Sequence, residues 1–167
     1  AQALSGPDGR PARLVVVCAQ IRDPGNAGTV IRCADAFGAD AVILSTDSVD
    51  LHNPKVVRAS VGSMFHLPIA TGVPLPEALD ACRAAGLKVL ATDGEAGVTL
   101  LDLGDELAAP TAWVMGNEAW GLPPEHAALA DASVAVPLYG HAESLNLATA
   151  AAICLYTSAT AQRAAHS

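Results

Sequence analysis

Residues 14–20 read LVVVCAQ, and the residues that follow them, 21–28, read IRDPGNAG. The first stretch is almost wholly apolar, which is typical of a central parallel strand covered on both faces. The second stretch contains Asp, Pro, Gly and Asn, which favour turns. Together they predict a buried strand that ends in a polar loop, followed by a helix over residues 29–37 that ends at Gly38.

The rest of the chain continues this alternation of short apolar stretches with helical patterns, which favours an α/β domain with a parallel, doubly wound sheet. With no internal repeat or linker, the sequence predicts one such domain over residues 14–167, preceded by a short N-terminal extension or linker at residues 1–13. Further strands are expected at residues 41–45, 65–70, 87–92, 111–115 and 133–138, and further helices at residues 54–60, 76–85, 123–130 and 145–162.

The composition excludes several classes of protein. With 51% hydrophobic and 16% charged residues among 167, the chain is not of the disordered type. Its 17 acidic and 9 basic side chains give a net charge of −8, and only 4% of its residues are aromatic. These values disfavour a basic nucleic-acid-binding arm and an aromatic platform for single strands. Any contact with nucleic acid must therefore depend on a local patch or on a separate domain.

Targeting segments and metal sites are not indicated. No apolar run approaches the ~20 residues of a spanning helix, and the N-terminus has no apolar signal segment. No spacing of His, Asp or Glu suggests a metal site. The four cysteines lack metal-binding spacing and lie in apolar segments, so we expect buried free thiols, which fits a reducing cytoplasm. They are Cys18, Cys33, Cys82 and Cys154.

Three polar, glycine-containing loops follow predicted strands, at residues 22–28, 116–121 and 140–146. Because ligands of open α/β sheets bind at the carboxyl ends of the strands, these loops are the expected site. The first loop matches neither the dinucleotide fingerprint nor the phosphate-binding loop of nucleotide hydrolases. Asn26 could simply cap the helix, and Arg32 could be either an ordinary surface residue or a phosphate clamp.

The other two loops have similar alternatives. Gly116 and Gly121 permit close approach to a ligand, whereas Glu118 between them could merely complete a tight turn. Ser144 is an N-cap candidate for the last helix. It lacks the surrounding residues of a nucleophile elbow, so a nucleophilic role has no support.

Four segments taken in order carry a family resemblance. They are DPGNAGTVIR at residues 23–32, NPKVVRASVGS at 53–63, VMGNEAWG at 114–121, and VPL at 136–138 with SLNLA at 144–148. The sequence resembles the SpoU (TrmH) branch of the SPOUT RNA methyltransferases over about residues 14–156. Several ordered motifs at the expected spacing are more specific than any one of them.

This resemblance implies a mostly parallel doubly wound sheet with a C-terminal deep trefoil knot, which general rules of chain topology would not suggest. It further implies a homodimer that binds S-adenosylmethionine (AdoMet) and methylates a ribose 2′-hydroxyl. We expect ribosomal RNA as the substrate. The alternatives are a transfer RNA 2′-O-methyltransferase and a non-catalytic RNA-associated dimer of the same fold. A nucleotide-binding oxidoreductase would share the sheet, but it would carry the glycine fingerprint that this sequence lacks.

The resemblance also carries roles onto individual residues. Arg32 is implicated in the loss of the hydroxyl proton, with Asn26 positioning it. Because the pKa of a guanidinium exceeds ~12, we expect Arg32 to orient groups and stabilise charge, the alternative being that it accepts the proton itself. The implied catalytic residues are Arg32, Asn26, Glu118, Ser144 and Asn146. The implied cofactor-binding residues are Thr92, Gly94, Gly116, Asn117, Val136, Leu138, Leu145 and Asn146.

Two expectations concern partners. Many family members carry an upstream RNA-binding domain, and we expect that domain to be absent from this chain. The final helix either forms part of a dimer contact, as the resemblance implies, or is an ordinary buried helix. The alternative is a compact member that contacts RNA directly through Arg22, Arg32, Lys55 and Arg58. A membrane partner is not expected, and the expected location is the cytoplasm.

Overall fold

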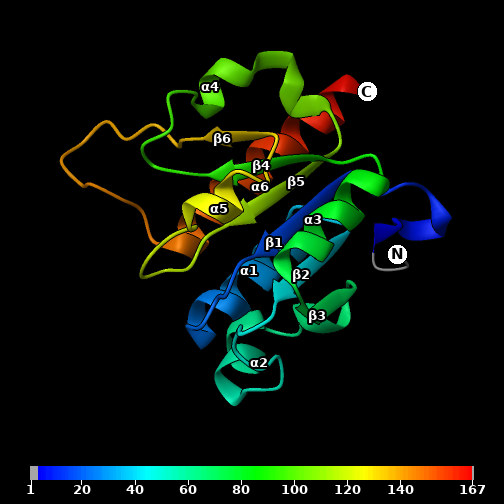
Figure 1. Cartoon of the computed structure of the whole chain (residues 1–167). Helices are drawn as coiled ribbons and strands as arrows, with labels where there is room; N and C mark the ends of the chain where they lie inside the picture. The colour runs from blue at the N-terminus through cyan, green and yellow to red at the C-terminus, as the bar shows by residue number, and fades with distance from the viewer. Residues whose placement is uncertain (1–3, 167) are drawn as a thin grey trace.

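Six parallel strands form one sheet in the computed structural model, which describes residues 4–166. Their spatial order is β3-β2-β1-β5-β4-β6, so the chain runs outward from β1 to β3 and then crosses to the other side of the sheet (Figure 1). This confirms the predicted α/β class and the parallel sheet. The strands are β1 (Leu14–Cys18), β2 (Ala41–Ser45), β3 (Ile69–Val73), β4 (Lys88–Thr92), β5 (Thr111–Met115) and β6 (Ala132–Val134).

The two central strands are buried along their whole length. In register, Val16 of β1 lies between Val42 of β2 and Trp113 of β5. Because successive side chains of a strand point to opposite faces, β1 contributes to two cores. Leu14 and Val16 pack on one face of the sheet, and the valines between and after them pack on the other.

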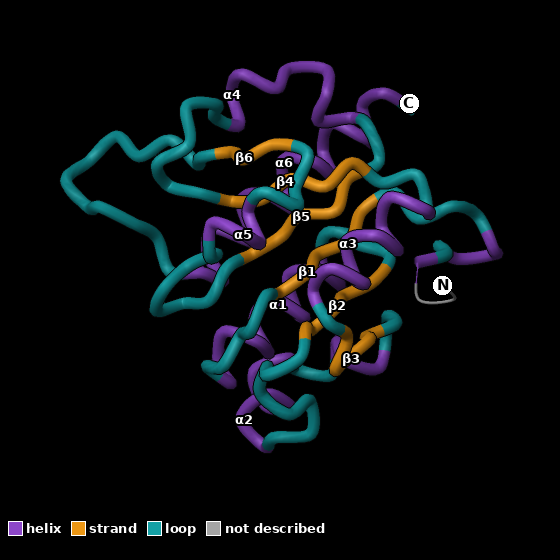
Figure 2. The backbone as a smooth tube through the Cα atoms, in the orientation of Figure 1, coloured by secondary structure: helices purple, strands orange, loops and turns teal. Residues whose placement is uncertain are grey.

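Helices cover both faces of the sheet. Residues of α1 (Pro24–Ala36), α2 (Pro54–Ser60) and α6 (Leu147–Ala165) belong to one core, and those of α3 (Leu75–Ala84) belong to the other. Residues just outside α5 (Pro124–Ala127) pack on the α3 side. Figure 2 shows the long loop that leaves the sheet after β6 and returns to the start of α6. The remaining elements are α4 (Leu100–Leu103) and the 3-10 helices η2 (Pro7–Gly9), η3 (Ser63–Phe65) and η4 (Gly104–Ala108).

The first helix begins earlier than the sequence pattern indicated. It starts at Pro24 rather than at residue 29, and Asp23 is its cap, with Oδ1 accepting a hydrogen bond from the Asn26 N–H at 3.0 Å. The interpretation of Asn26 as the cap was therefore wrong. Proline suits the first helical position, since its missing N–H would be unpaired there.

Three other boundaries also differ from expectation. The last helix begins at Leu147 with Asn146 as its cap, so the assignment of that role to Ser144 was wrong. The strand expected at residues 65–70 is displaced to β3, because the Ser63 hydroxyl donates to Asp35 and holds this part of the chain in a 3-10 turn. The last strand ends at Val134, beyond which only an isolated bridge between Ala135 and Thr99 continues the pairing.

The segment before β1 packs against the domain. Leu4 and Ala12 are buried in the core on the α3 side. All four cysteines are free, and Cys18, Cys82 and Cys154 are buried, as predicted. The expectation of burial was wrong for Cys33, which is only partly covered. Within residues 4–166, no helix has the length and apolarity needed to cross a membrane. Over the same residues, no cluster of His, Cys, Asp or Glu is arranged to hold a metal ion.

Candidate functional site

A cavity of about 550 Å³ lies where β4, β5 and β6 end. Thr92, Met115 and Val134, the last residues of these three strands, are part of its wall. The predicted loops at residues 116–121 and 140–146 supply most of the rest, and the first loop supplies only Asn26. The lining residues are Asn26, Thr92, Asp93, Gly94, Met115, Gly116, Asn117, Glu118, Ala119, Gly121, Val134, Val136, Leu138, Glu143, Ser144, Leu145, Asn146, Leu147 and Ala150.

The loop after β5 is a narrow turn. The N–H of Asn117 donates to the Gly121 carbonyl at 2.9 Å, and the Gly121 N–H donates back at 2.8 Å. A Cβ at Gly116 would lie 2.5 Å from the Gly121 carbonyl carbon and 2.6 Å from the Leu122 nitrogen. Only glycine fits at residue 116 without moving this backbone, which shapes one wall of the cavity.

Two side chains of this turn fasten it to the loop after β1. The buried Asn117 donates from Nδ2 to the Gln20 carbonyl at 2.7 Å. Glu118 Oε1 accepts hydrogen bonds from the N–H groups of Arg22 and Asp23, at 2.8 and 2.9 Å. The carboxylate of Glu118 therefore holds the two loops together, which makes Glu118 a positioning residue.

A contact between two asparagines joins the first and third loops. Asn146 caps α6 because its Oδ1 accepts from the N–H groups of Ala148 and Thr149, at 2.9 and 3.3 Å. Its Nδ2 donates to Asn26 Oδ1 at 3.1 Å. The amide of Asn146 is thus fixed on both sides, at the cavity wall.

Carboxylates supply all of the formal charge on the cavity wall. Asp93, Glu118 and Glu143 belong to the lining, which contains no Lys, Arg or His. Opposite charges attract strongly where protein excludes part of the water. The cavity therefore favours a cationic ligand and disfavours a phosphate.

The structure brings together nearly all of the predicted site residues. All eight cofactor candidates and four of the five catalytic candidates line the cavity, among them the exposed Ser144. Arg32 is exposed on α1 and does not line it. Six residues of helix at about 100° each turn the Arg32 side chain about 120° away from Asn26.

Some lining residues were not among the predicted set. Glu143 lies in the third predicted loop, so asking which carboxylates neutralise a cation could have found it. The apolar Leu147 and Ala150 of α6 gave no such signal, because their pattern is that of any buried helix face.

Comparison with known proteins identifies the family. The model of the SpoU rRNA Methylase family matches residues 13–156. The chain belongs to the SpoU rRNA methylase family. This confirms the resemblance that the loop motifs indicated.

SpoU proteins similar to this chain include ribosomal RNA enzymes. The 23S rRNA (guanosine(2553)-2'-O)-methyltransferase RlmP of Bacillus subtilis is 41% identical over 145 residues, covering 87% of this chain and 57% of the relative. The 23S rRNA (uridine(2479)-2'-O)-methyltransferase of Streptomyces viridochromogenes is 42% identical over 139 residues, covering 80% and 47%. This chain thus spans about half the length of these SpoU relatives.

Solved SpoU structures share the fold. The SpoU methyltransferase AviRb from Streptomyces viridochromogenes, in complex with the cofactor AdoMet, matches with a TM-score of 0.84 and 37% identity, covering 93% of this chain and 62% of that one. A structure described as giving insight into 2-OH methylation of C/U34 on tRNA matches with a TM-score of 0.79 and 28% identity, covering 93% and 99%.

Proposed function

We propose that this chain is the AdoMet-binding catalytic domain of an RNA ribose 2′-O-methyltransferase that acts on ribosomal RNA. The observation that carries the proposal is the cavity at the ends of β4, β5 and β6, whose wall holds three carboxylates and no cation. The family and the names of the relatives support the reaction and the substrate.

The residues of the cavity fit AdoMet. This cofactor carries a sulfonium, an ammonium and one carboxylate, so its net charge is positive, whereas the diphosphate of NAD would be repelled. Val136, Leu138 and Leu145 provide apolar wall for an adenine ring, and the backbone at Gly116 can be approached closely. When bound, AdoMet would supply the methyl group. A ribose oxygen would bond to the methyl carbon in line as the carbon–sulfur bond breaks, S-adenosylhomocysteine would leave, and the hydroxyl proton would pass to water. We propose that the eight predicted cofactor residues hold it.

The protein side of the reaction is mainly one of positioning. Asn26 and Asn146, hydrogen-bonded to each other, hold two loops at the cavity wall. Glu118 fixes the backbone of the first loop, and the exposed Ser144 hydroxyl can contact the ribose. Holding the reacting groups in near-attack geometry can lower the activation free energy by ~7–11 kcal/mol at best. Arg32 would stabilise charge on the RNA, since a guanidinium does not accept a proton at neutral pH.

Exposed apolar surface supports the homodimer. A further cavity, to which α6 contributes Ile153, is lined mainly by apolar groups that include Leu101 and Tyr139. Leu101 and Tyr139 are 73% and 85% exposed. A second copy that packs on α6 would remove this surface from water. We propose that the dimer forms there.

The path of α6 supports the C-terminal knot. Gln162 donates from Nε2 to the carbonyls of Arg13 and Ala109, which precede β1 and β5. The helix also packs against η4 and both of these strands. We propose that the chain passes through the loop formed by residues 93–110. A knot would then remain when the chain is stretched in optical tweezers, and the measured contour length would be shorter than that of an unknotted chain of the same number of residues.

One exposed surface supports RNA binding next to the cavity. Residues 51–76 contain no Asp or Glu, although the chain has 17 acidic residues. Lys55 and Arg58 are exposed in this stretch on α2, which packs closely on α1 at Gly28. We propose that these cations contact RNA together with Arg22 and Arg32. The predicted upstream RNA-binding domain, the domain boundary at residue 14 and the cytoplasmic location remain predictions.

The first experiment is calorimetric titration with AdoMet, S-adenosylhomocysteine and NAD in parallel. The proposal expects the two adenosyl ligands to bind and NAD to give no heat. Radiolabelled AdoMet is then incubated with 23S rRNA and with tRNA, and methylated ribose is recognised because its neighbouring phosphodiester resists alkaline hydrolysis. NAD binding alone would overturn the proposal.

Two outcomes separate the alternatives. Label in tRNA but not in 23S rRNA would favour a tRNA enzyme, as does the tRNA-related structure of which this chain covers 99%. AdoMet binding without any transfer would favour the non-catalytic dimer.

Within the proposal, Arg32→Ala abolishes transfer but changes AdoMet affinity by no more than a few-fold, because Arg32 does not line the cavity.

A further inference from the structure

A second cavity lies at the opposite edge of the sheet, where the strands begin. Its volume is about 280 Å³, and three separate parts of the chain enclose it. These are the segment before β1, the turn between α1 and β2, and the end of α6. The lining residues are Arg10, Arg13, Leu14, Phe37, Gly38, Asp40, Ala159, Gln162, Arg163 and His166.

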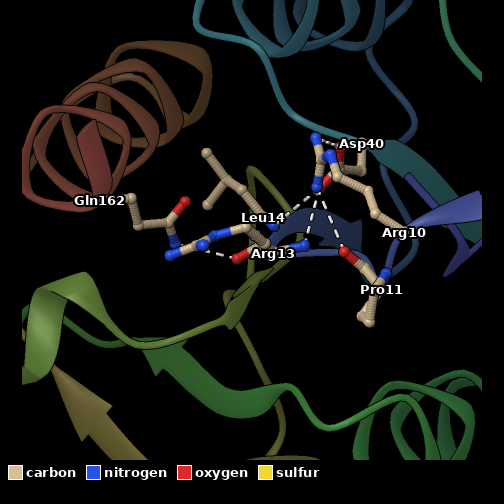
Figure 3. Close-up of polar contacts among 6 residues, drawn as sticks. All are labelled: Arg10, Pro11, Arg13, Leu14, Asp40 and Gln162. Atoms are coloured by element: carbon tan, nitrogen blue, oxygen red, sulfur yellow. Dashed lines mark hydrogen bonds and ion pairs between the residues drawn. The ribbon is translucent and has the colours of Figure 1, made fainter. Parts of the chain in front are cut away.

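The carboxylate of this cavity is fully engaged. Asp40, whose side chain is only 3% exposed, accepts hydrogen bonds from Arg10 Nη2 and the Arg13 N–H at 2.7 Å, and from the Leu14 N–H at 3.2 Å (Figure 3). Its charge is matched by Arg10, which it holds at the cavity. Opposite it, Gln162 donates to the Arg13 carbonyl and fixes this backbone from the side of α6 (Figure 3).

Two further guanidinium groups remain without a matching charge. Among residues 4–166, no carboxylate forms an ion pair with Arg13 or Arg163. The Nη2 atom of Arg163 lies 3.4 Å from where a Cβ on Gly38 would be, so this side chain reaches across to the turn after α1. Three of the nine Lys and Arg residues therefore meet at one cavity, to which residues 4–166 contribute a single, neutralised carboxylate.

We propose that this arginine cavity binds a backbone phosphate of the RNA substrate, at a point remote from the methylated nucleotide. Guanidinium groups bind phosphate oxygens in pairs, and this geometry favours Arg over Lys at phosphate sites. The whole chain has a net charge of −8, so RNA must bind at a local positive patch, and the net positive charge of this cavity provides one. The inference rests on the proposed function, because it takes RNA as the substrate.

The position of the cavity favours a polymer over a small phosphate compound. Arg10, Arg163 and His166 are exposed, so a small anion would keep much of its water and be held weakly. Leu147 at the first cavity and Arg163 at this one lie 16 residues apart in α6, which separates them by about 24 Å, or roughly seven phosphate steps along one strand of a duplex. One RNA can therefore occupy both cavities, and the phosphate contact would set its register without reading its sequence.

The test uses the double variant Arg13→Gln/Arg163→Gln, with Lys88→Gln as the matched control. Lys88 is a cation at the start of β4, 3.8 Å from Glu106, and it lines neither cavity. Arg10 is left unchanged because its removal would leave the buried Asp40 unpaired. The dissociation constant for a 23S rRNA transcript is measured over a series of salt concentrations, together with AdoMet affinity and the melting temperature.

The slope of log K against log salt falls by about 0.9 for each phosphate that the protein no longer neutralises. Because one phosphate is no longer neutralised, the double variant should show a slope shallower by about 0.9, with at least a tenfold weaker affinity at low salt and unchanged AdoMet binding. Arg163→Gln alone should give about half of this change, and Lys88→Gln should retain the wild-type slope. An unchanged slope in a folded double variant overturns the inference and leaves the proposed function intact.

Two further results are decisive. If inorganic phosphate binds the wild type and not the double variant while RNA affinity is equal in both, the site serves a free anion and the assignment to RNA is wrong. If the wild type fails to bind AdoMet, the proposed function itself fails. A double variant that loses RNA affinity only because it changes its oligomeric state, as measured by sedimentation, also overturns the inference.

Discussion

Asn146 donates a hydrogen bond from Nδ2 to Oδ1 of Asn26 at 3.1 Å, across 120 residues of sequence. This contact holds the cap of α6 next to the first turn of α1 at the cavity wall. The same side chain thus stabilises a helix and fixes the wall of the proposed AdoMet site.

Asn146→Ala should lower both stability and cofactor affinity. Loss of the cap costs about 1 kcal/mol, and the loop at residues 143–147 loses its link to Asn26. Asn146→Asp is the control, because its carboxylate oxygen still accepts from the helix N–H groups and suits a helix N-terminus. Thermal unfolding and calorimetric titration measure the two effects. An alanine variant as stable as the wild type would contradict the capping role.

Glu118→Gln tests whether charge or geometry matters at this position. The amide oxygen can still accept from the N–H groups of Arg22 and Asp23, so we expect a loss of only about 1 kcal/mol in stability. Removing one of the three carboxylates should weaken AdoMet binding by roughly fivefold. S-adenosylhomocysteine, which lacks the sulfonium charge, should lose less affinity. Equal losses for the two ligands would show that the charge of Glu118 plays no part.

Gly116→Ala should be destabilising because of its close backbone neighbours. The added Cβ would meet the Gly121 carbonyl carbon at 2.5 Å and the Leu122 nitrogen at 2.6 Å. Overpacking of this kind costs about 1–3 kcal/mol, and the shifted turn should weaken AdoMet binding. Gly97→Ala is the matched control, because nothing lies within 4 Å of its Cβ position. Similar melting temperatures for the two variants would refute the close-approach argument.

Cys33 should react with iodoacetamide first. Burial raises the pKa of Cys18 and Cys154 to about 12 and that of Cys82 to about 11. Since the thiolate is the reactive form, these three thiols are almost wholly protonated and unreactive at pH 8. The pKa of Cys33 is also raised by burial, but its side chain is only partly covered. Peptide mass spectrometry should find one labelled site in the folded protein and four after denaturation. Early labelling of Cys154 would mean that α6 separates from the sheet.

Local patterns predicted what local chemistry decides. The strands at residues 14–18 and 111–115 were found because all of their side chains are buried, which makes each of them an apolar run. The placement of the site followed from the rule that parallel strands present their carboxyl ends, and the loops after them, at one edge. That rule, with the motifs, gave eleven of the nineteen residues that line the cavity.

Tertiary contacts decided the rest. Asp23 and Asn26, like Ser144 and Asn146, are neighbouring candidates for one cap, and sequence alone does not rank them. Asn146 is selected because it also meets Asn26, and the turn at Ser63 is held by a hydrogen bond to Asp35. The insertion of β5 between β1 and β4 is a pairing of distant segments, which no short window of sequence contains.

The pairing of β1 with β5 also has a consequence during synthesis of the protein. Leu14 is in register with Thr111, so 97 residues separate the two partners. At about 5–20 residues per second on a ribosome, one edge of this valine-rich strand waits roughly 5 to 20 s for its neighbour to emerge. An unpaired edge of that kind is a template for association with other chains. The interval before residue 115 leaves the ribosome is therefore when the nascent chain most needs a chaperone.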